Sequence, residues 1–248
     1  MKRYFIVAAA LALLMTDANA ARESRKEKAD SVKTYALQEV QVLSTRAGET
    51  TPITHTDISK NQIKSMNYGK DIPFILSLTP SVTTTSDAGN GIGYTSIRVR
   101  GTDPTRINIT ANGVPINDSE SSNVYWTNMP DFASSVESMQ IQRGVGTSTN
   151  GAGAFGATIN MQTENIGVKP FGGVDLSAGS YGSHKETFRF GTGLINGHWG
   201  FQGRLSNVGS DGYIDRASSK LDSYFLQGGY FSDNTVVKFN ECPQVANQ

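Results

Sequence analysis

Between residues 95 and 163 the chain contains four short segments in which apolar and polar residues alternate. Strict alternation predicts β-strands with one face in a core and one in water, because successive strand side chains point to opposite faces. Between the second and third segments, Asn112 and Gly113 tolerate positive φ and predict a tight turn. The pattern therefore predicts a compact sheet with polar outer faces. Its apolar positions are Ile97, Val99, Ile107, Ile109, Met139, Ile141, Ala157, Ile159 and Met161.

Two short helices are predicted before these strands. Thr56 and Asp57 are suitable capping residues for the first helix. Asp71 and Pro73 provide an acidic first turn with a proline near its start for the second. The first helix should bury Ile58, Ile63 and Met66, and the second should bury Ile75, Leu76 and Leu78 before Pro80 ends it.

The N-terminus has the features of a secretory signal peptide. Lys2 and Arg3 form a basic start, about twelve mostly apolar residues follow, and Ala18 and Ala20 define an A-x-A cleavage site. The apolar run is too short for a membrane-spanning helix, which needs about twenty residues. The sequence therefore predicts export with cleavage after residue 20, followed by a charged linker from residue 21.

Composition excludes two classes of exported or binding protein. Cys242 is the chain's single cysteine, so no intrachain disulfide can form and a small disulfide scaffold is excluded. The 22 basic and 22 acidic residues balance, so the chain has no global positive field for nucleic acid.

From Phe171 onward the pattern changes to segments of about ten residues that alternate apolar and polar side chains. Asn196 and Gly197 separate two of them as a two-residue hairpin turn. This pattern is typical of transmembrane β-barrel strands, although a soluble antiparallel sheet has the same period. The apolar positions are Val174, Leu176, Ala178, Phe188, Phe190, Leu194, Trp199, Phe201, Leu205, Tyr224, Leu226 and Tyr230, and the alternate positions include Asp175, Ser177, Arg189, Gln202 and Arg204.

Three ordered stretches carry a further signal: SIRVRGTDPTRINITANGVPIND, VESMQIQRG and GAGAFGATINMQT. Together they resemble the plug domain of TonB-dependent outer-membrane receptors, in particular siderophore and cobalamin receptors of the Bacteroidetes type. The resemblance implies an α+β plug domain, with a small mixed sheet and short helices, followed by the first antiparallel strands of a transmembrane β-barrel. The plug motif positions are Arg98, Arg100, Gly101, Arg106, Asn112, Gly113, Arg143, Gly144, Gly153 and Gly156.

A short strand-prone segment lies between the charged linker and the first predicted helix. It could add to the sheet edge of a partner protein, or it could be the first strand of the plug. In the family this place holds the TonB box, through which the receptor is coupled to TonB. The residues that resemble the box are Glu39, Val40, Gln41, Val42, Leu43 and Ser44.

The polar loop of residues 119–132 carries two aromatic residues, Tyr125 and Trp126. Exposed rings flanked by serine and asparagine suit a ligand-facing loop, because rings stack on apolar faces while amides bind polar edges. The alternative is that both rings pack on the plug's helices.

No catalytic or metal-binding constellation is found, and no cofactor is expected. Residues 151–156 satisfy G-x-G-x-x-G, but residues 157–162 alternate like a strand, whereas a dinucleotide site needs a helix there. His55, His184 and His198 are far apart in the sequence. The chain is therefore predicted not to be an enzyme.

Together these features predict a TonB-dependent outer-membrane receptor for active uptake of a scarce nutrient such as an iron-siderophore or cobalamin. The expected partners are TonB, an external ligand such as a metal chelate, and outer-membrane lipid, but no nucleic acid. The alternative is a secreted or surface β-rich binding or adhesin domain without transport. Because transporters of this kind close about 22 strands, we also expect further strands beyond Gln248. The predicted regions are the signal peptide (1–20), the linker with the TonB box (21–50), the plug (51–166) and the first barrel strands (167–248).

Overall fold

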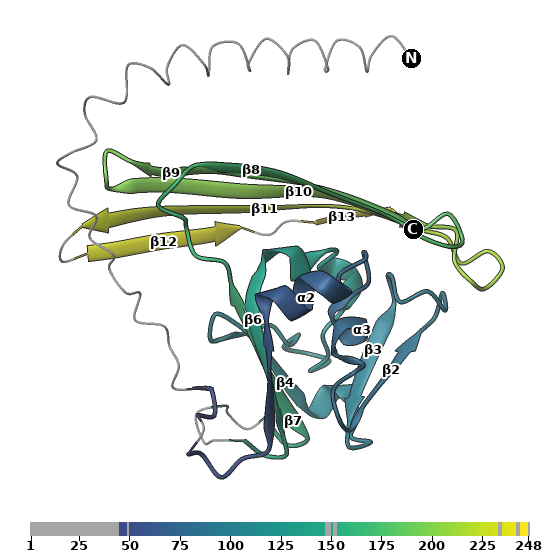
Figure 1. The fold of residues 1–248 in the computed structure, drawn as a ribbon. Helices are drawn as coiled ribbons and strands as arrows, with labels where there is room; N and C mark the ends of the chain where they lie inside the picture. Colours follow the sequence, from purple (N-terminus) through teal and green to yellow (C-terminus); the bar gives the residue numbers. More distant parts are fainter. Residues whose placement is uncertain are drawn as a thin grey trace, which may run out of the picture. The chain divides into compact units, whose positions relative to one another are not determined.

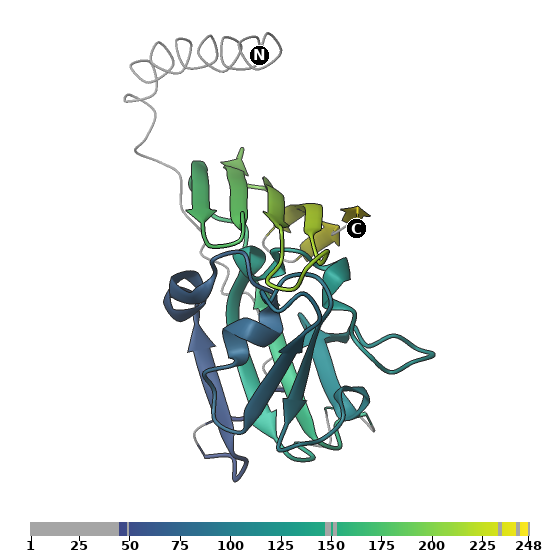
Figure 2. The same ribbon diagram turned by 90° about the vertical axis from the view of Figure 1, so that its right-hand side faces the viewer.

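The computed structural model describes residues 45–48, 50–146, 150, 153–232, 235–241 and 244–247, the last of these by backbone alone. The predicted signal peptide, the linker up to residue 44 with its TonB-box segment, Gly151 and Cys242 lie outside the described residues. The described residues form three sheets, shown in two views in Figures 1 and 2.

A five-stranded central sheet organises the N-terminal part of the fold, with strand order β1-β6-β7-β4-β5. Strands β4 and β7 are parallel, and every other neighbouring pair is antiparallel. This confirms the predicted mixed sheet. Its strands are β1 (His55–Ser59), β4 (Ile107–Ala111), β5 (Val114–Pro115), β6 (Val136–Arg143) and β7 (Ala157–Thr163).

The first predicted strand does not belong to the central sheet. It is β3 (Thr95–Val99), which pairs only with β2 (Val82–Ser86) in a separate two-stranded sheet. The prediction that Ile97 and Val99 share one sheet face with Ile159 was therefore wrong. Their side chains nevertheless belong to one core cluster, because the two sheets pack their apolar faces together.

The prediction that the polar face of the central sheet lies in water is also wrong, since that face is buried. Gln140 exchanges hydrogen bonds with the backbone of Ala47 at 2.8 and 2.9 Å. Gln142 and Asn160 donate to the carbonyl of Thr45 at 2.8 and 3.0 Å. The segment that precedes the fold thus covers this face and satisfies its amides, as burial of polar groups requires.

The first helix begins later than predicted. Residues His55–Ser59 form β1 because they pair with β6, and α2 (Lys60–Met66) follows with a capping box between Ser59 and Gln62. The second helix, α3 (Ile72–Leu76), begins with a proline in its first turn as predicted, but Asp71 is its N-cap and not part of an acidic first turn, and the helix ends before Leu78, which is 81% exposed rather than buried. Among the described residues no helix is long and apolar enough to cross a membrane.

Short 3₁₀ turns connect these elements, and one core joins them. The buried apolar cluster contains Ile63 of α2 and Ile75 of α3, as predicted. The turns are η2 (Pro104–Arg106), η3 (Trp126–Asn128) and η4 (Phe132–Ser135).

The C-terminal sheet is antiparallel, with order β12-β11-β10-β9-β8, and β13 (Gln244–Asn247) also pairs with β11. The predicted hairpin turn between β9 and β10 is confirmed, with φ of 52° at Asn196 and 77° at Gly197. The strands are β8 (Phe171–Ala178), β9 (His184–Ile195), β10 (Trp199–Ser210), β11 (Ser219–Ser232) and β12 (Thr235–Glu241).

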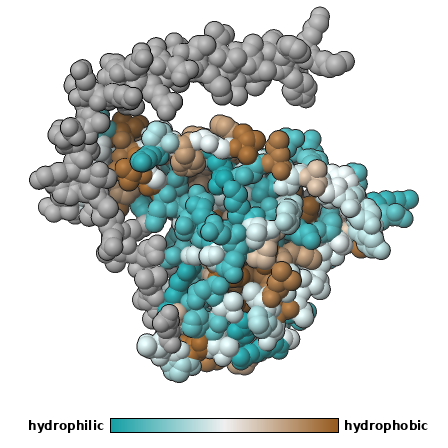
Figure 3. Space-filling model, viewed as in Figure 1, coloured by the Kyte–Doolittle hydropathy of each residue, from teal (hydrophilic) through white to brown (hydrophobic). Residues whose placement is uncertain are grey.

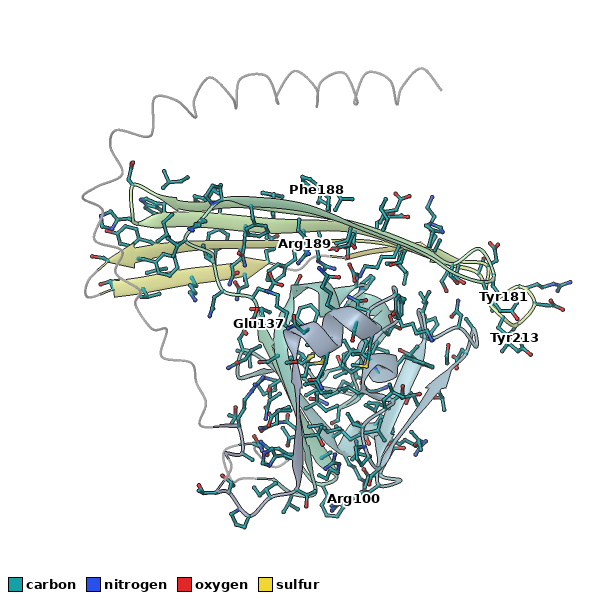
Figure 4. All side chains as sticks on the ribbon, in the orientation of Figure 1. Arg100, Glu137, Tyr181, Phe188, Arg189 and Tyr213 are labelled. Carbon is teal, nitrogen blue, oxygen red and sulfur yellow. The ribbon has the colours of Figure 1, made fainter. Side chains whose placement is uncertain are left out.

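The two faces of the C-terminal sheet differ in polarity. One face carries a row of apolar side chains in register across β8 to β11, and the opposite face carries a polar row. Figure 4 shows the neighbours Phe188 and Arg189 on opposite sides of the sheet, and hydrophobic side chains appear over these strands in Figure 3. The apolar row is Val174, Phe188, Leu205 and Tyr224; the polar row is Asp175, Thr187, Ser206 and Ser223.

The apolar face is nearly as tall as a membrane band. On β10 it runs from Trp199, beside Tyr230, to the polar Asn207. At about 3.3 Å per residue this distance is roughly 26 Å along the strand, or about 20 Å along the membrane normal for a strand tilted by about 40°. Barrel proteins have an outward apolar band about 25 Å tall that ends in aromatic residues.

A charge on this face should therefore be costly. We expect Leu205→Arg to destabilise the membrane-inserted protein by about 2 to 4 kcal/mol, because Leu205 lies within the band and is 52% exposed on its outer face. Asn207→Arg, at the polar edge of the same face, should cost only about 0 to 1 kcal/mol. Denaturant unfolding in lipid vesicles measures both variants, and equal stability of the two would contradict a lipid-facing band.

Candidate functional site

The plug and the C-terminal sheet meet at the end of the sheet that carries its longer loops. These are residues 179–183 between β8 and β9 and residues 211–218 between β10 and β11, and we call this the loop end. The backbone N–H of Tyr213 donates to the carbonyl of Ala88 at 3.0 Å. The glycine-rich plug loop 87–94 therefore lies at the loop end.

An exposed aromatic cluster forms there. The rings of Tyr181 and Tyr213 pack edge to face, with centroids 5.4 Å apart, and the side chains are 53% and 65% exposed (Figure 4). Tyr94 and Ile214 are also at least half exposed. Such amphipathic rings suit contact with a ligand that has apolar and polar parts. Sequence reasoning missed the pair of Tyr181 and Tyr213 because the two residues come from separate loops.

The two aromatic residues predicted to face a ligand have different environments. Tyr125 is 45% exposed, but Trp126 is only 3% exposed and belongs to the plug core. The prediction for Trp126 is therefore corrected in favour of the packing alternative, because η3 turns its large ring inward. The ligand-facing role of Tyr125 stays a prediction.

The arginines of the plug motif mainly make contacts within the plug. Arg143 is buried and donates to the carbonyl of Pro80 at 3.0 Å and to the hydroxyl of Thr56. Burial lowers the pKa of Arg143, and the nearby charge of Arg100 lowers it further. Arg100 is exposed, with a φ of 51° (Figure 4). Arg98 pairs with Asp103 at 3.6 Å, and Arg106 lies over the ring of Phe155 at 5.5 Å.

The remaining motif positions meet backbone requirements. Asn112 and Gly113 have φ of 52° and 82°, which confirms the predicted turn between β4 and β5. Gly101 and Gly144 also have positive φ, of 76° and 103°. Gly156 lies against Thr102, where a Cβ atom would clash, whereas Gly153 has open space around it.

The chain carries no dinucleotide site at residues 153–163, because these residues lead into β7 and not into a helix. Within the described ranges, no three His, Cys, Asp or Glu side chains gather as potential metal ligands. Nδ1 of His55 and Nδ1 of His184 instead donate to the backbone carbonyls of Ile53 at 2.9 Å and Gly182 at 3.0 Å.

The plug loop at the loop end is held by a buried carboxylate. Asp71 accepts hydrogen bonds from the hydroxyl of Thr95 at 2.8 Å and from the backbone of Gly93, and its own N–H donates to Gly91 at 2.9 Å. Burial raises the pKa of Asp71 to about 7, although these two hydrogen bonds lower it.

Stability should therefore depend on pH through Asp71. An unfolded aspartate has a pKa near 3.9, so between about pH 4 and pH 7 the folded chain binds the extra proton and stability falls as pH rises. We expect the unfolding temperature of the plug to drop by several degrees from pH 5 to pH 8, and Asp71→Asn to remove much of this drop. Calorimetry in detergent measures the unfolding temperature at each pH. If Asp71→Asn showed the same dependence of unfolding temperature on pH as the wild type, Asp71 would be excluded as the cause.

Sequence reasoning also missed a charged cluster formed by Asp131, Lys185 and Arg204, all of which are buried. The available sequence signal was one cation at an inward position of each strand, Lys185 on β9 and Arg204 on β10. Their acidic partner, Asp131, lies more than fifty residues earlier in the chain.

Comparison with known proteins agrees with this architecture. The sequence profile described as TonB-dependent Receptor Plug Domain matches residues 47–158. No curated protein matches the chain in sequence.

Solved structures with a similar fold include receptors for ferric yersiniabactin, ferripyoverdine and alcaligin. The ferric yersiniabactin uptake receptor FyuA from Yersinia pestis superposes with a TM-score of 0.63 at 16% identity, covering 79% of this chain and 32% of that receptor. The ferripyoverdine receptor of Pseudomonas aeruginosa superposes with a TM-score of 0.62 at 17% identity, and the match covers 77% of this chain and 25% of that receptor. The alcaligin receptor FauA from Bordetella pertussis superposes with a TM-score of 0.58 at 17% identity, and the match covers 79% of this chain and 33% of that receptor. The chain thus spans about a quarter to a third of the length of these receptors.

The family is one of receptors and transporters. Its plug profile covers both helices, the loop that reaches the loop end and the central sheet up to the first residues of β7, and the C-terminal sheet follows β7. Residues 47–158 therefore match the plug domain of TonB-dependent receptors, and β8 to β12 have the fold of the antiparallel strands that follow the plug in these solved structures.

Proposed function

We propose that the chain takes part in active uptake of a scarce nutrient across the outer membrane, with the plug occluding a barrel until TonB acts on it. The observation that carries this proposal is a plug domain in contact with strands that are apolar on one face and polar on the face toward the plug. A secreted adhesin would leave the apolar row of Val174, Phe188, Leu205 and Tyr224 in water, which disfavours that alternative.

The proposed division of the chain keeps the boundaries predicted from sequence. Residues 1–20 direct export, residues 21–50 hold the TonB box, residues 51–166 form the plug and residues 167–248 supply barrel strands. The TonB box is proposed at residues 39–44, where its backbone would add a strand to TonB.

The ligand is proposed to bind at the loop end. Periplasmic turns of outer-membrane barrels are short and extracellular loops are longer, so the two-residue turn at Asn196 and Gly197 would face the periplasm and the loop end would face outward. The exposed rings of Tyr181 and Tyr213, with Tyr125 as a further candidate, would contact the ligand. An iron-siderophore is favoured over cobalamin, because the named structural relatives are receptors for yersiniabactin, pyoverdine and alcaligin.

Uptake assays test this proposal. Cells with and without the gene are given radioactive iron bound to yersiniabactin, pyoverdine or alcaligin, or radiolabelled cobalamin. We expect one ligand class to accumulate only when the gene is present, and a protonophore to stop its accumulation without reducing its binding at the cell surface. Accumulation that is independent of the gene for every ligand class would contradict the proposal.

A further inference from the structure

A buried ionic cluster joins the plug to the C-terminal sheet. At its centre is Asp131, just before η4 of the plug. Its carboxylate pairs with Nζ of Lys185 on β9 at 2.8 Å and with Nη1 of Arg204 on β10 at 3.0 Å. The three side chains are 0%, 3% and 2% exposed, respectively, so water does not screen their charges.

Three hydroxyl groups and the side-chain amide of Asn67, which donates to Oδ1 at 3.2 Å, also contact this carboxylate. Ser134 donates to Oδ1 at 2.6 Å, and Thr187 and Ser206 donate to Oδ2 at 2.7 and 2.6 Å. The guanidinium of Arg204 also donates to the backbone carbonyl of Asp131. Most of the partners of Asp131 therefore belong to the C-terminal sheet rather than to the plug.

The carboxylate of Asp131 is stabilised in its ionised form by the two neighbouring cations. Burial alone would raise the pKa of Asp131, but Arg204 and Lys185 outweigh this effect, so the pKa lies well below its usual range. The carboxylate consequently stays ionised at neutral pH. Opening this contact would break two buried ion pairs and the hydrogen bonds from Thr187 and Ser206. Removing the carboxylate alone would leave two buried cations without their counter-ion, which is strongly unfavourable.

Another ion pair of the plug lies at the surface, where water reaches both side chains. Lys60 and Glu137 pair at 2.9 Å, but both side chains are 44% exposed (Figure 4). Solvent screens such a pair, and it contributes little. The Asp131 cluster is therefore the more costly contact to open.

We propose that Asp131, Lys185 and Arg204 are positioning residues that keep plug residues 130–135 attached to β9 and β10 throughout the transport cycle. This proposal rests on the proposed function. Any movement of the plug that opens a path through the barrel would then begin in parts of the plug that lack such a cluster.

A ligand-independent experiment tests the strength of the anchor. The receptor is placed in planar lipid bilayers, and potassium chloride conductance is recorded as urea is raised. We expect Asp131→Asn to open the pore at a urea concentration lower by on the order of 1 M than wild type. The matched control, Glu137→Gln, should leave the opening concentration unchanged. If Asp131→Asn and wild type opened at the same urea concentration, the proposal that Asp131 anchors the plug would be overturned.

A reversible cross-link tests whether the anchor persists during transport, and it does not depend on the folding of a charge variant. The hydroxyl of Ser223 donates to the carbonyl of Pro130 at 2.9 Å, so the double variant Pro130→Cys with Ser223→Cys places two thiols beside the cluster. Uptake of radioactive iron bound to yersiniabactin, pyoverdine or alcaligin is compared before and after dithiothreitol. Equal uptake supports the proposal, and loss of uptake that dithiothreitol restores would overturn it.

The two proposals fail in distinguishable ways. If wild-type cells accumulate none of the probes in a gene-dependent manner, the proposed function fails, while the conductance experiment still decides the anchor. If wild type transports a probe and the oxidised double variant does not, the function stands and the anchor is released during transport.

Discussion

Proline at Val40 or Val42 is expected to abolish uptake of the transported ligand while leaving its binding at the cell surface intact. If residues 39–44 pair with TonB by strand addition, their contribution comes from backbone donors. Proline removes one such donor and fixes φ, so each variant should break coupling. Binding and accumulation of the radioactive complex are measured on the same cells, in the receptor expressed from its own gene.

The matched control is Val42→Ala, which keeps the backbone N–H and should transport almost normally. The alternative is that this segment is an internal plug strand. In that case the prolines should destabilise the folded protein by several kcal/mol and lower its abundance. Loss of binding and uptake together, with less receptor in the membrane, would therefore contradict the coupling role.

Ile159→Ala is expected to lower the free energy of unfolding of the plug by about 2 to 5 kcal/mol. Ile159 is fully buried in β7, where it is the register partner of Ile109 on β4 and of Ile141 on β6. Removing its side chain leaves a cavity between two strands that cannot collapse independently.

Fluorescence of the buried Trp126 can report this transition. Urea unfolding is followed in a Trp199→Phe background, so that Trp126 is the reporter. Val114→Ala serves as the control, because Val114 lies in the same sheet but is 64% exposed. An unfolding midpoint of Ile159→Ala equal to that of the control would show that β7 is not part of the core as described.

Sequence alone determined the features that depend on neighbouring residues. Period-two alternation located β4, β6, β7 and β8 to β11, because strand side chains point alternately to two faces, but it did not locate β12 or β13. The Asn112-Gly113 and Asn196-Gly197 turns were predictable because both residues tolerate positive φ. Asp71 and Pro73 likewise marked the start of α3 from local capping preferences.

The tertiary structure decided what depends on partners distant in the chain. Alternation cannot show that β3 leaves the central sheet, nor that residues 45–47 bury the polar face of β6, because both depend on which segments meet in space. Trp126 and Tyr125 are neighbours with similar surroundings in sequence, yet packing buries only one of them. Asp131 acquires its role in the same way, since a carboxylate becomes a buried anchor only when β9 and β10 bring Lys185 and Arg204 to it and exclude water.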